Sequence, residues 1–170
     1  MRIGKKRAKE IGAEMRKKVS FDTMAIVDAV QSWESLQYLG RCRHYKLIIS
    51  TRVEGEAINR LQKPPYNYNE EQAKEEVRKV MRYLNLTRKI KEKIDDEMGD
   101  KLIEKYGNIG CHYPDSTIIA HMKRIGVNIV ISRDRNFKKV AEREGLKVHH
   151  IPTQDAIIDR RVRELFRCRH

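Results

Sequence analysis

The chain has 170 residues, of which 39% are hydrophobic and 36% are charged, and its formal net charge is +13 at neutral pH. This length predicts one domain whose core needs no disulfide, and the three cysteines without C-x-x-C spacing predict neither a disulfide framework nor a zinc site. No apolar run reaches the length of a membrane span, so we expect no membrane partner. The cysteine pattern is consistent with a reducing cytoplasm. The net charge of +13 attracts polyanions, so we expect a nucleic acid such as RNA as the ligand.

Basic residues gather at both ends of the chain. Residues 1–18 carry eight Lys or Arg side chains against two Glu, and residues 160–169 carry five Arg. We therefore predict a basic N-terminal extension over residues 1–18, with Lys5, Lys6 and Arg7 facing phosphates, and one folded domain over residues 19–170.

Strand and helix patterns alternate after the extension. Short β-prone runs at 19–21, 47–49, 128–132 and 148–151 predict strands, and the continuous apolar character of 47–49 is typical of a strand in a parallel sheet. Helical spacing predicts helices over 24–38, 52–62, 135–144 and from Asp115 to a stop at Gly126, together with a helical hairpin over 69–106 and a C-terminal amphipathic helix. The expected fold is α/β, with three layers and a mainly parallel central sheet flanked by helices.

Four acidic residues stand where the predicted strands end or the next helices begin. Asp22 and Asp134 follow strands, Glu56 lies in the first turns of a helix after a strand, and Asp115 opens a helix. Open parallel sheets bind ligands beyond the carboxyl ends of their strands. Carboxylates gathered there repel one another, and Mg²⁺ or Mn²⁺ would remove that repulsion.

Each acid also has a purely structural interpretation. An Asp after a strand or before a helix commonly caps the helix, and Glu56 is spaced to pair with Arg52 or Arg60 at i,i+4. The metal hypothesis depends on all four acids falling at one edge of one sheet.

Three segments resemble the PIN-domain family of metal-dependent ribonucleases. VSFDTMAIVDAV is similar to its first strand and opening Asp, and ISTRVEGEAINRL is similar to its strand-to-helix segment with an inward Glu. YPDSTIIAHMKRIGVNIVISRDRNF resembles its most characteristic stretch, in which an Asp, a helix and a strand lead to Ser/Thr-Arg-Asp and Phe. The resemblance covers roughly residues 18–151.

The resemblance implies a metal-holding and catalytic set of Asp22, Glu56, Asp115 and Asp134, with Glu54 as a rival for the second position. It further implies that Thr23, Ser132 and Asn136 support the ligands or contact water on the metal. The sequence departs from the family pattern at Met24, where Asn is frequent, and at Asn136, where a further Asp is common.

The leading hypothesis is an endoribonuclease that cleaves single-stranded or looped RNA by a metal-activated water. Arg133, Arg135 and Lys138, with the basic ends, are expected to hold the RNA backbone. Expected protein partners are a second copy of the chain, bound through residues 69–106 and their neighbours, and either an antitoxin-like or an RNA-processing protein; the basic extensions favour processing.

Two other function classes stay open. A PIN-like module that binds RNA with little or no cleavage is motivated by Met24 and Asn136. A receiver-like or phosphatase-like domain would also gather acids, but a phosphatase of that kind needs Asp two residues after its nucleophile, where Met24 stands.

Aromatic and histidine residues complete the candidates. Tyr66 and Tyr68, beside Pro64-Pro65, are candidates for base stacking, whereas Trp33 at helical spacing is expected in the core. His121 is expected to be solvated or structural, because the histidines form no H-x-x-x-H pair.

Overall fold

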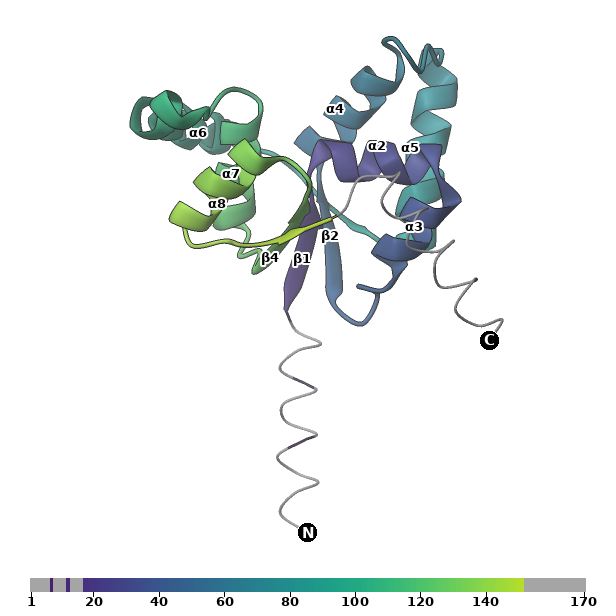
Figure 1. Cartoon of the computed structure of the whole chain (residues 1–170), viewed down its shortest axis with the longest axis horizontal. Helices are drawn as coiled ribbons and strands as arrows, with labels where there is room; N and C mark the ends of the chain where they lie inside the picture. Colours follow the sequence, from purple (N-terminus) through teal and green to yellow (C-terminus); the bar gives the residue numbers. More distant parts are fainter. Residues whose placement is uncertain (1–6, 8–11, 13–16, 152–170) are drawn as a thin grey trace, which may run out of the picture.

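A computed structural model describes residues 7, 12 and 17–151. Its centre is a five-stranded sheet in the order β3-β2-β1-β4-β5, and every neighbouring pair of strands is parallel (Figure 1). The strands are β1 (Lys18–Phe21), β2 (Lys46–Ser50), β3 (Thr87–Lys89), β4 (Ile129–Ser132) and β5 (Lys147–His150). The predicted α/β class with a parallel sheet is confirmed.

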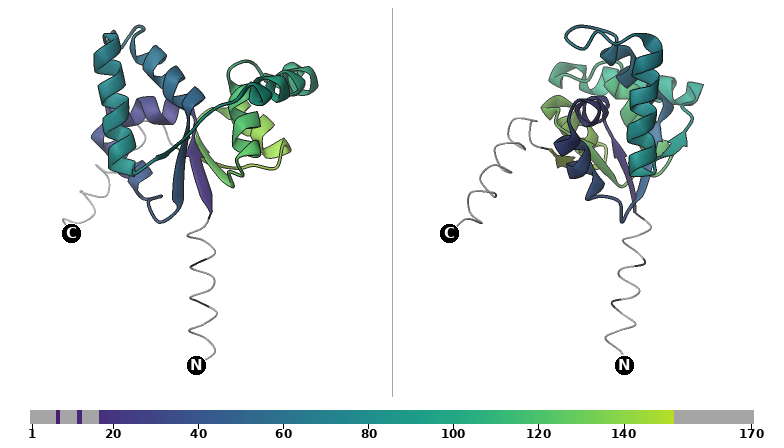
Figure 2. Two further views of the ribbon diagram at one scale, coloured as in Figure 1. Left: turned by 180° about the vertical axis from the view of Figure 1, so that it is seen from behind. Right: turned by 90° about the vertical axis from the view of Figure 1, so that its right-hand side faces the viewer.

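Helices flank the sheet on both sides, which gives three layers (Figures 1 and 2). The side that packs around α2 holds α2 (Thr23–Gln31), α3 (Trp33–Gly40), α4 (Thr51–Leu61) and α5 (Glu70–Leu84). The other side holds α6 (Lys93–Tyr106), a 3₁₀ turn (Gly107–Ile109), α7 (Asp115–Arg124) and α8 (Arg135–Arg143).

The strand order explains this division. From β1 the chain moves outward to β2 and β3, then returns to place β4 and β5 on the other side of β1. Right-handed crossovers in opposite directions put their helices on opposite faces of the sheet. The direction of winding reverses between β1 and β4, and the crevice beyond such a reversal is where open α/β sheets bind ligands.

The three central strands are apolar because helices cover both of their faces. Val19, Phe21, Ile48, Ile49 and Val130 are fully buried in β1, β2 and β4. Burial on both faces removes the alternation of polar and apolar residues that a half-exposed strand would show. Among the described residues, no helix is long and apolar enough to span a membrane.

Two predictions about the helices are wrong. The helix expected over 24–38 is divided at Ser32, whose backbone is extended and whose Oγ accepts a hydrogen bond from the Ser35 amide at 3.2 Å. Trp33 consequently begins a new helix and is 53% exposed instead of lying in the core. Apolar spacing alone predicted one continuous helix, but Ser32 caps a second helix and so divides the segment in two.

The helical hairpin expected over 69–106 is also absent. Strand β3 separates α5 from α6, and the two helices pack on different partners, α5 on α2 and α4, and α6 on α7. Strand β3 is three residues long, polar and at the edge of the sheet. Edge strands are often short and charged, so apolar periodicity gave no sign of it.

The tightest helix contact predicts a pair of opposite stability changes. A Cβ built on Gly99 of α6 would lie 2.9 Å from the Thr117 backbone nitrogen of α7. Gly99→Ala should lower the free energy of unfolding by roughly 1–3 kcal/mol, because backbone cannot move aside as a flexible side chain can. Gly55→Ala in α4 is the matched control, since a Cβ there meets nothing within 4 Å. It should raise stability by roughly 0.5–1 kcal/mol. Denaturant unfolding of both variants checks this, and a shift in the same direction would refute the packing argument.

Candidate metal centre

Asp22 lies directly beyond β1 and is 5% exposed. Its Oδ1 accepts a hydrogen bond from the Ala25 amide at 2.8 Å, so it caps α2, and its Oδ2 accepts a hydrogen bond from the Ser132 hydroxyl. The Asp22 amide donates to the Ile131 carbonyl at 3.0 Å, which ties the end of β1 to β4. The carboxylate is therefore fixed at the reversal point of the sheet.

Asp134 lies two residues beyond β4 and caps α8. Its Oδ1 accepts hydrogen bonds from the Asn136 amide at 2.7 Å and the Phe137 amide at 3.0 Å. The Asp134 amide donates to Ser132 Oγ at 3.0 Å, while that same hydroxyl donates to Asp22. Ser132 thus joins the two aspartates.

Glu56 lies in α4, in the second turn after β2, and Arg52 binds it. Arg52 Nη2 is 2.8 Å from Glu56 Oε1, which is the i,i+4 pair that the spacing indicated. Its rival Glu54 pairs with Arg88 of β3 at 2.5 Å. Glu54 is thus engaged with the edge of the sheet, while Glu56 acts electrostatically on Asp115.

Asp115 is the first residue of α7. Its pKa is raised to about 7, mainly by burial and then by the charges of Asp134, Asp22 and Glu56 in that order. The pKa of Asp22 is raised to about 6, because burial and, to a smaller extent, the charges of Asp134 and Asp28 outweigh the hydrogen bonds from Ser132 and the Ala25 amide. These mutual effects place all four predicted acids within electrostatic reach at one edge of the sheet.

The four carboxylates do not form a closed cage in this conformation. Among residues 7, 12 and 17–151, no group of three or more His, Cys, Asp or Glu is arranged so that it could hold a metal ion. Asp22 and Asp134 each accept hydrogen bonds from helix amides through one oxygen, and Glu56 is paired with Arg52. An ion would have to draw Glu56 away from that guanidinium.

Asp28 is a buried acid near this cluster that the sequence did not single out. It is 6% exposed on α2, and Arg133 Nε lies 3.3 Å from its Oδ2. Burial raises the pKa of Asp28, and Arg133 lowers it in part. A lone Asp inside the apolar run TMAIVDAV was the available signal. Arg133, expected to hold RNA, is therefore already paired inside the domain.

The other predicted residues lie in different surroundings. Thr23 is half-buried in the first turn of α2, and the Asn136 side chain packs over Gly110, where an added Cβ would lie 3.0 Å from Asn136 Nδ2. Arg7 and Arg135 are exposed, and Lys138 Nζ is 3.9 Å from Glu142. Lys5, Lys6 and the expected C-terminal helix lie outside the described residues.

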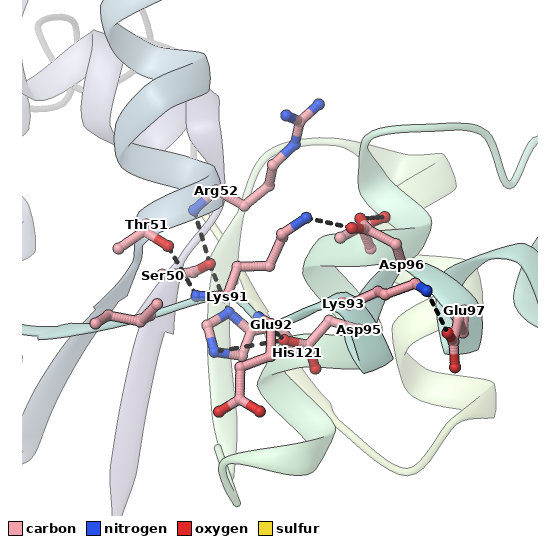
Figure 3. A network of polar contacts seen from close by, with 12 residues as sticks. Ser50, Thr51, Arg52, Lys91, Glu92, Lys93, Asp95, Asp96, Glu97 and His121 are labelled. Carbon is pink, nitrogen blue, oxygen red and sulfur yellow. Dashed lines mark hydrogen bonds and ion pairs between the residues drawn. The ribbon is translucent and has the colours of Figure 1, made fainter.

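A buried polar network beside the acids fixes α4 against α7 (Figure 3). His121 of α7 is fully buried, its Nδ1 is 2.7 Å from Ser50 Oγ, and Ser50 caps α4 through the Arg52 amide at 3.1 Å. The other ring nitrogen of His121, Nε2, lies 4.0 Å from buried Asp95, and Arg124 Nε binds Asp95 at 2.7 Å. Burial lowers the pKa of His121 and the charge of Asp95 opposes this shift, and the fully buried ring is not solvated. The network holds the helices that carry Glu56 and Asp115.

Comparisons with known proteins agree with this architecture. The family model for the PIN domain matches residues 19–143. Among solved structures, the chain is similar to a crystal structure of VapBC2 from Rickettsia felis bound to a DNA fragment from their promoter. The TM-score is 0.60 at 14% identity, with 78% of this chain and 98% of that chain covered, so this likeness concerns the fold alone. A search of curated proteins finds no match.

The family match extends over the part of the chain that builds the site. Residues 19–143 contain β1, β2 and β4, the reversal point between them, and Asp22, Glu56, Asp115 and Asp134. The chain therefore belongs to the PIN domain family, whose members are generally nucleases.

Proposed function

We propose that this protein is a metal-dependent endoribonuclease that cleaves single-stranded or looped RNA. The observation that carries the proposal is the gathering of Asp22, Glu56, Asp115 and Asp134 at the reversal point of the sheet, where burial and mutual repulsion raise the pKa of Asp115 to about 7. Charge of one sign is collected there at a cost to stability, and binding of a cation would offset that cost.

The donor set suits a hard divalent cation. Carboxylate oxygens with water are the ligands that Mg²⁺ and Mn²⁺ prefer, and the four acids supply oxygen ligands. Arg52 is the cation that occupies Glu56 in the present conformation. We propose that Asp22, Asp115 and Asp134, joined by Glu56 when it leaves Arg52, hold the ion.

When bound, the ion lowers the pKa of a coordinated water for attack on phosphorus and offsets charge on the phosphate oxygens. The chain's own residues supply position. Ser132 holds Asp22 and the Asp134 amide together, and the His121–Ser50 contact holds α7 against α4. Exposed Arg135 and the half-exposed Lys138 stand at the start of α8 to hold the RNA backbone.

A binding module with little or no cleavage is the second candidate. Asn136 supplies no charge where the family commonly has Asp, and its side chain packs over Gly110 instead of joining the four acids. Cleavage with and without metal separates the two candidates.

Two apolar surfaces suit protein partners. A groove of about 370 Å³ between α2, α3 and α5 is lined mainly by apolar and aromatic residues, among them Val30, Trp33, Leu36 and Tyr83, and also by Glu76 and Lys79. We propose it for an antitoxin-like or RNA-processing protein, by analogy with the two-protein VapBC2 complex. Ile90, Ile94 and Met98, which are 68%, 44% and 44% exposed, suit a second copy of the chain.

Cys42 and Cys111 are free thiols, in keeping with a proposed cytoplasmic location.

Repulsion among the acids predicts a pH-dependent gain of stability in Asp115→Asn. The folded-state pKa of about 7 lies above the ordinary Asp value of 3.8. Asp115 therefore does not change the free energy of unfolding below about pH 4. That free energy falls as pH rises from about 4 to 7, and above about pH 7 the full cost of ionising Asp115 in the folded state applies. Without metal, Asp115→Asn should gain roughly 2 kcal/mol at about pH 8, or roughly 4–8 °C in Tm, and almost nothing near pH 4.

Asp100→Asn, an exposed position on α6, controls for general charge effects and should show no such gain. Saturating Mg²⁺ or Mn²⁺ should reverse the order, because the wild type gains more from binding than a variant that lacks one ligand. Thermal unfolding across pH with EDTA or metal checks both points. A wild type whose Tm does not respond to metal would contradict the proposed site.

A matched pair in α4 tests which acid serves cleavage. Glu56→Gln should lower the rate of RNA cleavage at least about 100-fold, because it removes a proposed ligand, whereas Glu54→Gln should leave it near wild type. Asp22→Asn should also abolish cleavage yet keep its helix cap, since Asn caps as well as Asp. The assay follows a labelled single-stranded RNA with EDTA, Mg²⁺ or Mn²⁺. Equal activity of the two Glu variants would reject the assignment of Glu56.

The basic extension predicts a salt effect on RNA binding. Residues 1–16 should be removed and Lys17 kept, because the Lys17 carbonyl accepts a hydrogen bond from the Lys46 amide at 3.1 Å. Each lost phosphate contact should flatten the log–log dependence of affinity on salt by about 0.7. Cleavage at saturating RNA should stay near the full-length rate. An unchanged slope with a lowered Tm would instead mean that the segment stabilises the domain.

A further inference from the structure

The sequence indicated Tyr66 and Tyr68 as candidates for base stacking, but in the structure the exposed tyrosine near the four acids is Tyr113. Tyr66 and Tyr68 are half-buried against the core, and the Tyr68 hydroxyl accepts a hydrogen bond from Gln31 at 3.1 Å. Tyr113 is 58% exposed and stands two residues before Asp115. Its surroundings distinguish it from an ordinary exposed aromatic residue.

Arg52 covers one face of the Tyr113 ring. Its guanidinium carbon lies 4.4 Å from the ring centroid, and its Nη2 binds Glu56 Oε1 at 2.8 Å. The ring, the guanidinium and the carboxylate therefore form a continuous row from the surface to the acidic cluster. A cation on the face of an aromatic ring restrains both side chains.

The backbone also holds Tyr113 beside α7. The Ser116 amide donates to the His112 carbonyl at 3.0 Å, and the Ile118 amide donates to the Pro114 carbonyl at 3.1 Å. These bonds close the turn that contains Tyr113 onto the first turn of the helix that begins at Asp115. The ring is thus held at the edge of the site while most of its surface stays open.

We infer that Tyr113 is a stacking platform for one nucleobase of single-stranded RNA bound at the acidic cluster. The inference rests on the proposed function, because it requires RNA at this site. A base would lie on the ring face turned away from Arg52, and its own sugar would carry a phosphate toward Asp115 and Glu56. Every base has a π-face, so the platform accepts any base and selects unpaired over paired nucleotides.

The alternative explanation is that Tyr113 only supports Arg52 and, through it, Glu56. The two differ in what the ligand must contain. A platform needs the ring of the protein and the base of the RNA together, whereas a support for Arg52 acts on the phosphates whether or not a base is present. A cycle of protein and RNA changes separates them.

The experiment uses the full chain with a short single-stranded RNA that carries one 2-aminopurine, whose fluorescence falls on stacking, in low salt with Ca²⁺ as the divalent ion. Tyr113→Ala should weaken binding roughly 10-fold and abolish the quenching, and Tyr113→Phe should keep both. An RNA with an abasic site in place of the 2-aminopurine should bind the wild type as weakly as Tyr113→Ala binds the intact RNA, with no further loss in the variant.

An unchanged dissociation constant in Tyr113→Ala would overturn the inference, and so would an equal loss for the intact and abasic RNAs. Gel analysis of the same proteins with Mg²⁺ or Mn²⁺ tests the proposed function separately. Quenched RNA that is never cleaved would reject the nuclease and keep the platform. Cleavage and binding that do not depend on the ring would reject the platform and keep the nuclease.

Discussion

The repulsion among carboxylates at the reversal point of the sheet is the constraint on which the rest of the structure depends. Asp22 is 5% exposed with a pKa raised to about 6, and Asp115 has a pKa raised to about 7, because burial and then the neighbouring carboxylates disfavour their charged forms. Strands β1 and β4, in each of which the last three residues are buried, hold them there. Stability gained in the core offsets a cost at the site.

Two of the acids serve the fold and the site with different atoms. Asp22 Oδ1 caps α2 and Asp134 Oδ1 caps α8, so each carboxylate caps its helix through one oxygen only. Ser132 then fixes the two relative to each other by donating to one residue and accepting from the amide of the other. The structural and the metal-binding interpretations of these aspartates are thus compatible, because a helix cap is what holds the carboxylate in place.

The positions of Asp22 and Asp134 at the ends of strands could be predicted, because each follows an apolar run that is typical of a buried strand. The start of α5 could be predicted from Asn69, which caps it. Strand β3 could not be predicted, since Thr87–Lys89 is short and polar, and the division of the first helix depended on one Ser32 hydroxyl. Arg52 and Tyr113 are 61 positions apart in the sequence (113 − 52). A local sequence pattern cannot predict a contact between residues so far apart.

The charge distribution orders the events of the proposed reaction. The chain carries a formal charge of +13, but the site itself is acidic, and two nearby guanidinium groups are already paired, Arg52 with Glu56 and Arg133 with Asp28. A phosphate approaching the four carboxylates without a cation would meet like charge in a partly buried place, where screening by water is weak. Basic residues outside the site can attract RNA to the surface, but they cannot seat a phosphate on the acids. A divalent ion must therefore arrive with or before the scissile phosphate, and the departure of Glu56 from Arg52 would free a guanidinium beside the RNA as that happens.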